Sequence, residues 1–100
     1  MRSTIDNHFK DSLRRDVPPF KITDHDEDPV VWVKLKATWA PFEWHIIDFD
    51  GEDRCYGVVD WFGRRLIRFS LRRVLSLRGP NGETIIRDYR FAPCRVSDLE

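Results

Sequence analysis

The chain has 100 residues and a formal net charge of zero, and 41% of its residues are hydrophobic, 13% aromatic and 34% charged. A chain of this length buries about two-thirds of its unfolded surface and forms one domain without needing metals or disulfides. No apolar run approaches the roughly 18 residues of a membrane span, and the N-terminal residues lack the apolar stretch of a secretory signal. Both features predict a cytoplasmic protein that does not bind membranes.

Apolar residues recur every four positions near the N-terminus, at Ile5, Phe9 and Leu13. This spacing predicts an amphipathic helix over about residues 6–15, and the pair of prolines that begins at Pro18 ends it. An acidic, solvated loop is predicted next. The carboxylates of this loop are those of Asp24, Asp26, Glu27 and Asp28.

The following segments alternate apolar and polar residues with the period of β-strands. Strands are predicted over residues 30–38, 42–49, 54–62 and 65–69, with a fifth extended segment inside residues 83–91. Asp50-Gly51 favours a hairpin between the second and third strands, because glycine tolerates positive φ there. Ser70 is predicted to cap a short helix that reaches about Leu75.

These elements together predict an α+β fold. We expect a mainly antiparallel, meander-like sheet of about four to five strands, an N-terminal helix and a short helix after the fourth strand. A single domain is predicted over residues 1–100. Within it, residues 1–20 form the N-terminal helix and its proline stop, and residues 30–99 form the sheet-based core.

The charges are divided unevenly along the chain. Residues 1–53 carry 7 basic and 12 acidic side chains, a net charge of −5, whereas residues 54–100 carry 10 and 5, a net charge of +5. All ten cations of the second half are arginines. Such asymmetry indicates an interaction surface, although the two halves can also neutralise one another within one fold.

The densest group of cations combines arginines with aromatic rings and is the first candidate for a partner-binding surface. This basic-aromatic set consists of Trp61, Arg64, Arg65, Arg68, Arg72 and Arg73. Three interpretations stay open: pairing with the acidic half, a protein interface with Arg and Trp as hot spots, or contact with phosphates and stacked bases of nucleic acid. The sequence pI of about 6.8 argues against a dedicated nucleic-acid binder.

The alternative candidate surface is acidic and joins two predicted loops. This acidic set consists of Asp24, Asp26, Glu27 and Asp28 in the first loop and Asp50, Glu52 and Asp53 in the hairpin turn. If the loops lie together, their carboxylates could mimic a row of phosphates and occupy a nucleic-acid-binding groove of a partner. A solvated turn is the plainer interpretation of the same residues.

No constellation of residues predicts catalysis or a metal site. The acidic turn fails the spacing of an EF-hand, because a loop that starts at Asp48 places Asp53 where that motif needs glycine and Val59 where it needs glutamate. The best acid–base candidate is His45 with Glu43 on the same strand face, for which an ordinary strand histidine is the preferred interpretation. We therefore predict no catalytic residue, no metal and no cofactor.

The two cysteines, Cys55 and Cys94, lie 39 residues apart and lack Cys-x-x-Cys spacing. Neither has a histidine beside it, so no zinc site is expected there. Reduced thiols are expected, as in most cytosolic proteins, and the sequence leaves open whether the two cysteines ever pair.

Several short segments occur in the order and spacing of a known family. They are Pro18-Pro19-Phe20, Val33-Lys34, Phe49-Asp50-Gly51-Glu52-Asp53, Tyr56-Gly57-Val58-Val59, Phe69-Ser70-Leu71, Arg78-Gly79-Pro80-Asn81-Gly82 and Arg87-Asp88. Through them, residues 17–99 resemble DUF2958, a bacterial family of unknown function found largely on plasmids, prophages and other mobile elements. One departure is the stretch around Ser70, which is usually less basic in that family.

The resemblance implies a biological context and no established active site. A member of this family is expected to be an accessory protein of a phage or plasmid in the cytoplasm of a bacterial host. With the candidate surfaces, this predicts a small non-enzymatic protein that binds, and inhibits, a host protein complex of anti-invader defence. The alternative is a nucleic-acid-binding accessory factor of the mobile element that uses the arginines of the basic-aromatic set. The oligomeric state stays open.

Overall fold

The computed structural model describes residues 4–18 and 27–99. It begins with helix α1 (Thr4–Asp16), whose Leu13 side chain is completely buried. The predicted N-terminal helix is thus confirmed, with slightly wider bounds. Within the described residues, no helix has both the length and the apolar character that crossing a membrane requires.

Across the described residues, seven strands form two antiparallel sheets. The strands are β1 (Val30–Val31), β2 (Val33–Ala37), β3 (Glu43–Phe49), β4 (Arg54–Asp60), β5 (Arg64–Ser70), β6 (Ile85–Arg87) and β7 (Cys94–Arg95). One sheet has the order β5-β4-β3-β2-β6, and the other pairs β1 with β7. The predicted α+β class with a mainly antiparallel sheet is confirmed. Four strands form the predicted meander, and β6 joins it beside β2.

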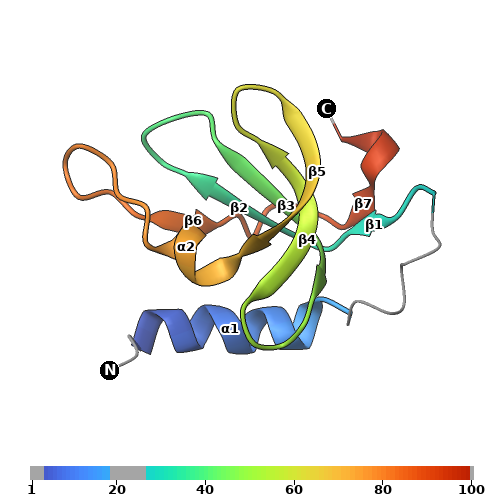
Figure 1. Ribbon diagram of the computed structural model, residues 1–100, viewed down its shortest axis with the longest axis horizontal. Helices are drawn as coiled ribbons and strands as arrows, with labels where there is room; N and C mark the ends of the chain where they lie inside the picture. The colour runs from blue at the N-terminus through green and yellow to red at the C-terminus, as the bar shows by residue number, and fades with distance from the viewer. Residues whose placement is uncertain (1–3, 19–26, 100) are drawn as a thin grey trace.

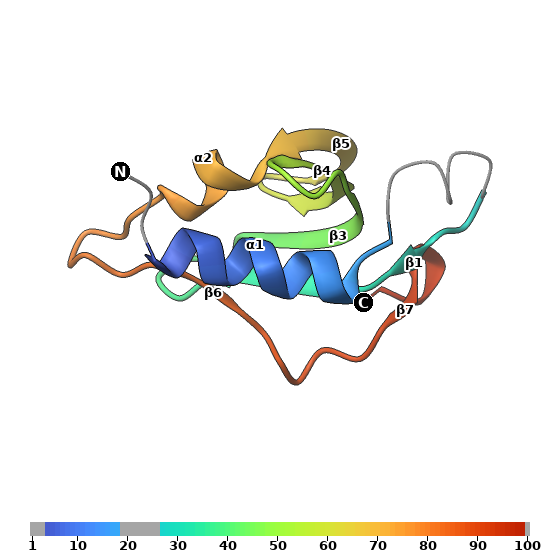
Figure 2. The same ribbon diagram turned by 90° about the horizontal axis from the view of Figure 1, so that it is seen from below.

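Two short helical segments complete the described fold, namely α2 (Leu71–Leu75) after β5 and the 3-10 helix η2 (Val96–Asp98) after β7. As predicted, Ser70 caps α2, because its Oγ accepts a hydrogen bond from the N–H of Arg73 at 3.3 Å. Figure 1 shows α1 across the lower end of the sheet, with β7 and η2 beside β1 on the right. The view in Figure 2, turned by 90°, shows α1 and α2 on the same side of the strongly twisted sheet.

The core lies between the helices and one face of the five-stranded sheet. Its buried residues are Leu13, Val17, Val33, Leu35, Ala37, Trp44, Ile46, Phe49, Cys55, Val59, Leu71, Val74, Leu75 and Ile85. Alternation along β2 and β4 places every second side chain on this face, which is why the period-two pattern predicted these strands. Burial of this apolar surface supplies the main free energy of folding.

A β-bulge interrupts the pairing of β3 with β4. The register shifts between Ile46 and Asp48, so that Ile47 has no partner on β4, and both Ile46 and Phe49 can face the core. Gly57 lies opposite Ile46, where a Cβ atom would be 1.9 Å from the carbonyl oxygen of His45. The two strand backbones therefore approach too closely at this point for any other residue.

A single strand was predicted over residues 30–38, and this prediction is wrong. The segment contains two strands that belong to different sheets. β1 pairs with β7, whereas β2 pairs with β3 and β6. At the junction, Trp32 donates its N–H to the carbonyl oxygen of Ile46 at 2.9 Å. The partner of β1 comes from near the C-terminal end of the chain, and a local hydrophobic pattern carries no information about such a distant pairing.

Other predicted bounds need smaller corrections. The strand predicted over residues 54–62 ends at Asp60, because the three residues after it form the turn into β5. β5 is longer than predicted, and the extended segment inside residues 83–91 contains only the short strand β6. β7 was not predicted from the sequence, and it forms only through its pairing with β1.

Candidate functional site

β5 lies at one edge of the five-stranded sheet and, among the described residues, pairs only with β4. Its first five residues are exposed, so that side chains on both faces of this strand are accessible. At their centre are two apolar residues, Leu66 and Ile67, which are 48% and 41% exposed. An edge strand presents unpaired N–H and C=O groups to which another chain can bind. β5 is therefore an exposed edge of the sheet to which another chain could pair.

Backbone hydrogen bonds at both ends of β5 establish which of its groups face away from β4. Leu71 donates its N–H to the carbonyl oxygen of Asp53 at 2.7 Å, and Trp61 donates to that of Gly63 at 3.2 Å. Hydrogen-bonded and non-hydrogen-bonded pairs alternate in an antiparallel ladder. The β5 residues that bond to β4 are therefore Arg65, Ile67 and Phe69. Those whose N–H and C=O groups point outward are Arg64, Leu66 and Arg68.

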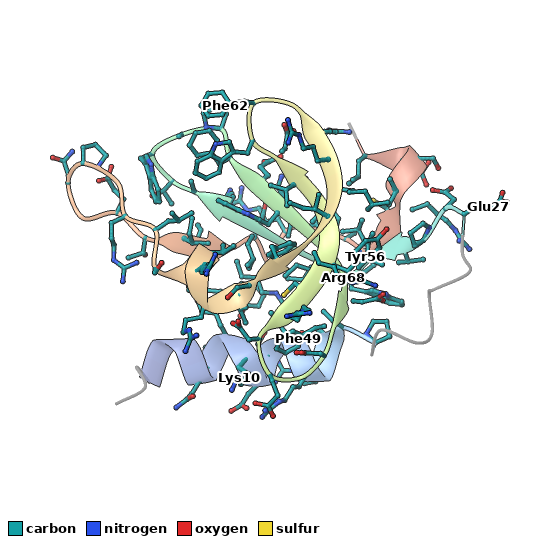
Figure 3. All side chains as sticks on the ribbon, viewed as in Figure 1. Lys10, Glu27, Phe49, Tyr56, Phe62 and Arg68 are labelled. Carbon is teal, nitrogen blue, oxygen red and sulfur yellow. The ribbon has the colours of Figure 1, made fainter. Side chains whose placement is uncertain are left out.

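The turn that leads into β5 carries a cluster of aromatic rings. Trp61 stacks on Phe42 with ring centroids 4.1 Å apart, and it meets Trp44 edge to face at 5.9 Å. Phe62 is 88% exposed and has a φ of 56°, a conformation that non-glycine residues rarely adopt. The β2–β3 and β4–β5 turns lie side by side (Figure 1), and Phe62 is at their tip (Figure 3). Large aromatic surface therefore adjoins the start of β5.

The opposite end of β5 opens onto a groove of about 600 Å³. Its lining includes four arginines, namely Arg54 of β4, Arg68 of β5, and Arg72 and Arg73 of α2. In the part of the chain that the structure describes, no ion pair involves Arg54, Arg72 or Arg73. We call this feature the arginine groove. Its positive charge and its guanidinium donors suit carboxylate or phosphate groups.

The structure distributes the basic-aromatic set along the whole length of β5. Trp61 and Arg64 lie at the start, where Arg64 is 3.5 Å from the carboxylate of Asp60 and donates to the carbonyl oxygen of Leu99 at 3.3 Å. Arg65 is on the face of β5 that continues the core side of the sheet. The members that share the arginine groove are Arg68, Arg72 and Arg73.

Sequence reasoning missed Arg54 and the Leu66-Ile67 pair as parts of this surface. Arg54 follows the acidic turn in sequence, and only the register of β4 with β5 places it opposite Ser70. A signal for the apolar pair was present, because adjacent apolar residues between arginines cannot both face one core from a half-buried strand. That pattern is typical of a strand with neither face covered.

The carboxylates of the hairpin turn make contacts within the chain. Although burial acts to raise it, the pKa of Asp50 is held below its usual value by three backbone N–H groups at 2.8, 2.9 and 3.0 Å. Glu52 forms ion pairs of 3.3 Å with Lys10 and with Arg14 of α1. Asp53 accepts hydrogen bonds from the Ser70 hydroxyl at 2.6 Å and from the N–H of Arg72 at 2.7 Å. These contacts attach the turn to both helices.

The predicted acidic loop is only partly within the described residues, because Asp24 and Asp26 lie outside them. Asp28 accepts hydrogen bonds from the Ser97 hydroxyl at 2.6 Å and from its N–H at 3.0 Å, and these bonds lower the pKa of Asp28. Glu27 is exposed and lies well away from Lys10, the partner of Glu52 (Figure 3). The described parts of the two acidic segments are therefore well separated.

The predicted acid–base candidate belongs to a charge network on the sheet face opposite the core. Lys34 lies 2.8 Å from Glu43, whose other carboxylate oxygen is 3.8 Å from Nε2 of His45. Asp88 completes the network 3.9 Å from Lys34. The side chain of His45 is only 4% exposed, and burial lowers its pKa despite the nearby Glu43. A substrate in solution cannot reach an imidazole that is covered in this way.

Within the described residues, no group of three or more His, Cys, Asp and Glu side chains could hold a metal ion. Both cysteines are free thiols, Cys55 in the core and Cys94 half-buried in β7. Burial raises the pKa of both, and neighbouring carboxylates act in the same direction. Neither thiol is therefore activated as a nucleophile.

Comparisons with known proteins add one family match. Neither the curated proteins nor the solved structures include a match to this chain. Residues 5–97 match the family model DUF2958, described as a protein of unknown function. The match includes α1 from its second residue onward, every strand of the described residues and the arginine groove. Since it covers nearly the whole sequence, this chain belongs to the DUF2958 family.

Proposed function

We propose that this protein is a non-enzymatic interaction protein that binds a partner protein along β5. The observation that carries the proposal is the exposure of residues 64–68 on both faces of an edge strand. Arginine and aromatic residues, which dominate interface hot spots, lie at both ends of this strand. A surface that only faced water would not need apolar residues at its centre or an exposed phenylalanine at its tip.

The partner is proposed to be a host protein complex of anti-invader defence, which binding would inhibit. This part of the proposal draws on the mobile-element context that the family resemblance implies. A small protein can inhibit a larger complex by occupying a surface that the complex needs for its own partner. An edge strand of seven residues, the first five of them exposed, is sufficient for such occupancy when hot-spot residues flank it.

The arginine groove favours a second candidate, a nucleic-acid-binding accessory factor of the mobile element. Its guanidinium groups suit phosphates, and Phe69 in the lining offers a ring for stacking. That mode of binding would weaken steeply with salt, because phosphate contacts release counterions. It would leave the outward backbone groups and the apolar centre of β5 unused, so we favour a protein partner.

A pull-down with the full chain from bacterial lysate tests both candidates. The informative variant is Ile67→Asp on β5, and its matched control is Ile86→Asp on β6, the other edge of the same sheet. These isoleucines are 41% and 38% exposed, so neither change disturbs the core. Nuclease treatment of the lysate separates a protein partner from one that is held through nucleic acid.

The proposal expects one protein that survives nuclease, disappears with Ile67→Asp and is retained with Ile86→Asp. Retention with both variants would overturn the assignment of the surface to β5. Loss of every captured protein after nuclease treatment would support the nucleic-acid candidate instead. Inhibition would then be measured as the fall in activity of the captured complex when the purified chain is added.

A further inference from the structure

We propose that β5 binds an acidic, extended segment of the partner as an added β-strand. The inference rests on the proposed function and specifies how that surface recognises its partner. It names a ligand chemistry, a polypeptide with acidic and apolar residues in a defined order.

The backbone of β5 already has the arrangement that an incoming strand needs. The N–H and C=O groups of Arg64, Leu66 and Arg68 point away from β4, as the hydrogen bonds at both ends of the strand require. Such groups recur every second residue, a spacing of about 7 Å that matches the ladder of a polypeptide strand. A nucleic-acid backbone has no alternation of donors and acceptors at this spacing.

The side chains of β5 define the order of residues in the added strand. Arg65 and Ile67 lie on one face, and Leu66 and Arg68 lie on the other. Directly opposite residues of paired strands contact one another, and opposite charges or apolar pairs are favourable there. The complement of the stretch from Arg65 to Arg68 is therefore acid–apolar–apolar–acid. This pattern is symmetric, so it fits a parallel or an antiparallel strand.

The arginine groove extends the same preference beyond the end of the strand. Besides Arg68 of β5, β4 and α2 supply its guanidinium groups, and Arg54, Arg72 and Arg73 have no carboxylate at ion-pair distance among the described residues. The carboxylate of Asp53 also lines the groove but is already bonded to the Ser70 hydroxyl and the Arg72 N–H. Further acidic residues at the α2 end of the segment would therefore gain charge-assisted contacts.

A second copy of the chain is not a favourable partner for this surface. If two β5 strands paired antiparallel, residues with outward backbone groups would lie opposite each other, and a pair centred on Leu66 would place Arg64 of one strand opposite Arg68 of the other. Like charges directly opposite each other destabilise a strand pair. Arginines also discourage unwanted pairing of edges, but a purely protective edge would not place Leu66 and Ile67 between them. The charge and the apolar centre together favour an acidic partner.

The direct test uses a blocked synthetic peptide, Thr-Glu-Val-Ile-Glu-Asp-Glu-Thr, with a scrambled peptide and an oligothymidine as probes of charge alone. Binding to the full chain is measured by fluorescence anisotropy, and amide hydrogen exchange is followed by NMR. Strand addition predicts that the N–H groups of Leu66 and Arg68 become protected when the peptide is bound. Those of Arg65 and Ile67 are already bonded to β4 and serve as internal references.

Charge reversal provides the matched variants. Arg65→Glu and Arg68→Glu are each expected to weaken peptide binding by about tenfold or more, because an opposite charge becomes a like charge. A peptide with lysine in place of the two framing glutamates should recover binding to the double variant. Arg90→Glu makes the same change of charge at an exposed position outside β5 and should leave the affinity unchanged.

The outcomes separate this inference from the proposed function. In one outcome, capture of the partner is lost with Ile67→Asp while the peptide leaves the Leu66 and Arg68 amides unprotected. In that case strand addition is overturned and the proposed function stands. Equal binding of the designed peptide, the scrambled peptide and oligothymidine would also overturn strand addition. If the pull-down partner survives Ile67→Asp, the proposed function fails, and strand addition to β5 fails with it.

Discussion

β3 and β5 are strands of seven residues on the two sides of β4, and they bury very different amounts of their surface. In β3 every residue after Glu43 is buried, because the helices cover one face and residues such as Phe91 lie on the other. In β5 the first five residues are exposed. The position of a strand in the sheet thus determines whether its apolar residues hold the fold together or remain exposed.

The most direct test of this difference is to truncate one isoleucine to alanine in each strand. Ile46→Ala in β3 should lower the free energy of unfolding by about 3–4 kcal/mol, because it leaves a cavity at a site that is completely buried. Ile67→Ala in β5 should cost less than about 1 kcal/mol. Urea denaturation of both variants measures the difference. Similar losses for the two variants would show that β5 is covered in solution.

The close approach of β3 and β4 gives the next largest effect. Gly57→Ala should destabilise the protein by about 2–3 kcal/mol, because the added methyl group would meet the carbonyl oxygen of His45 and force the strands apart. Thermal unfolding followed by circular dichroism measures the loss. An unchanged melting temperature would mean that the bulge beside Ile46 relaxes to accommodate the methyl group.

The connection between β5 and α2 depends on one carboxylate of the acidic turn. Asp53→Ala should lower stability by about 1–2 kcal/mol, because it removes the acceptor of the Ser70 hydroxyl and the Arg72 N–H. Glu52→Ala is the matched control in the same turn. Its ion pairs with α1 are at the surface and are worth less than about 1 kcal/mol. Chemical denaturation compares the two variants, and equal losses of stability would contradict a role of the Asp53 hydrogen bonds in holding α2.

The smallest expected effect is a pH dependence of the free energy of unfolding, which comes from His45 on the face of β3 opposite the core. Burial lowers the pKa of His45 below 6.5, so as the pH falls through about 6.5 the unfolded chain takes up a proton that the folded chain does not. The free energy of unfolding should therefore fall from pH 7 toward pH 5.5. His45→Gln should flatten this fall, whereas His8→Gln on the exposed side of α1 should preserve it. Urea titrations at several pH values measure the slopes.

Local patterns were sufficient to predict much of the fold. The spacing of Phe9 and Leu13 predicted α1, the alternation along β2 and β4 predicted strands, and Ser70 was correctly placed as the cap of α2. Each of these signals depends on residues within a few positions of one another. The break at Trp32 and the strand β7 could not be predicted. Both depend on the pairing of β1 with β7, which are far apart in the sequence.

The candidate surface was predictable in part. The arginines from Arg64 to Arg73 stood out by composition, and they do lie on or beside the exposed strand. Arg54 was missed because its contribution depends on the register between β4 and β5. The contacts of Asp53 with Ser70 and Arg72 were missed for the same reason, since a turn and a helix far along the chain must meet first.

The sequence by itself determined the α+β class, the hairpins and the concentration of arginine in the second half of this protein. These features follow from side-chain period, turn chemistry and composition, all of which are local. Only the tertiary structure decided that β3 is central and β5 is an edge. That difference depends on long-range strand order, and it is the reason that Leu66 and Ile67 are exposed beside the arginines while Ile46 and Ile47 lie in the interior.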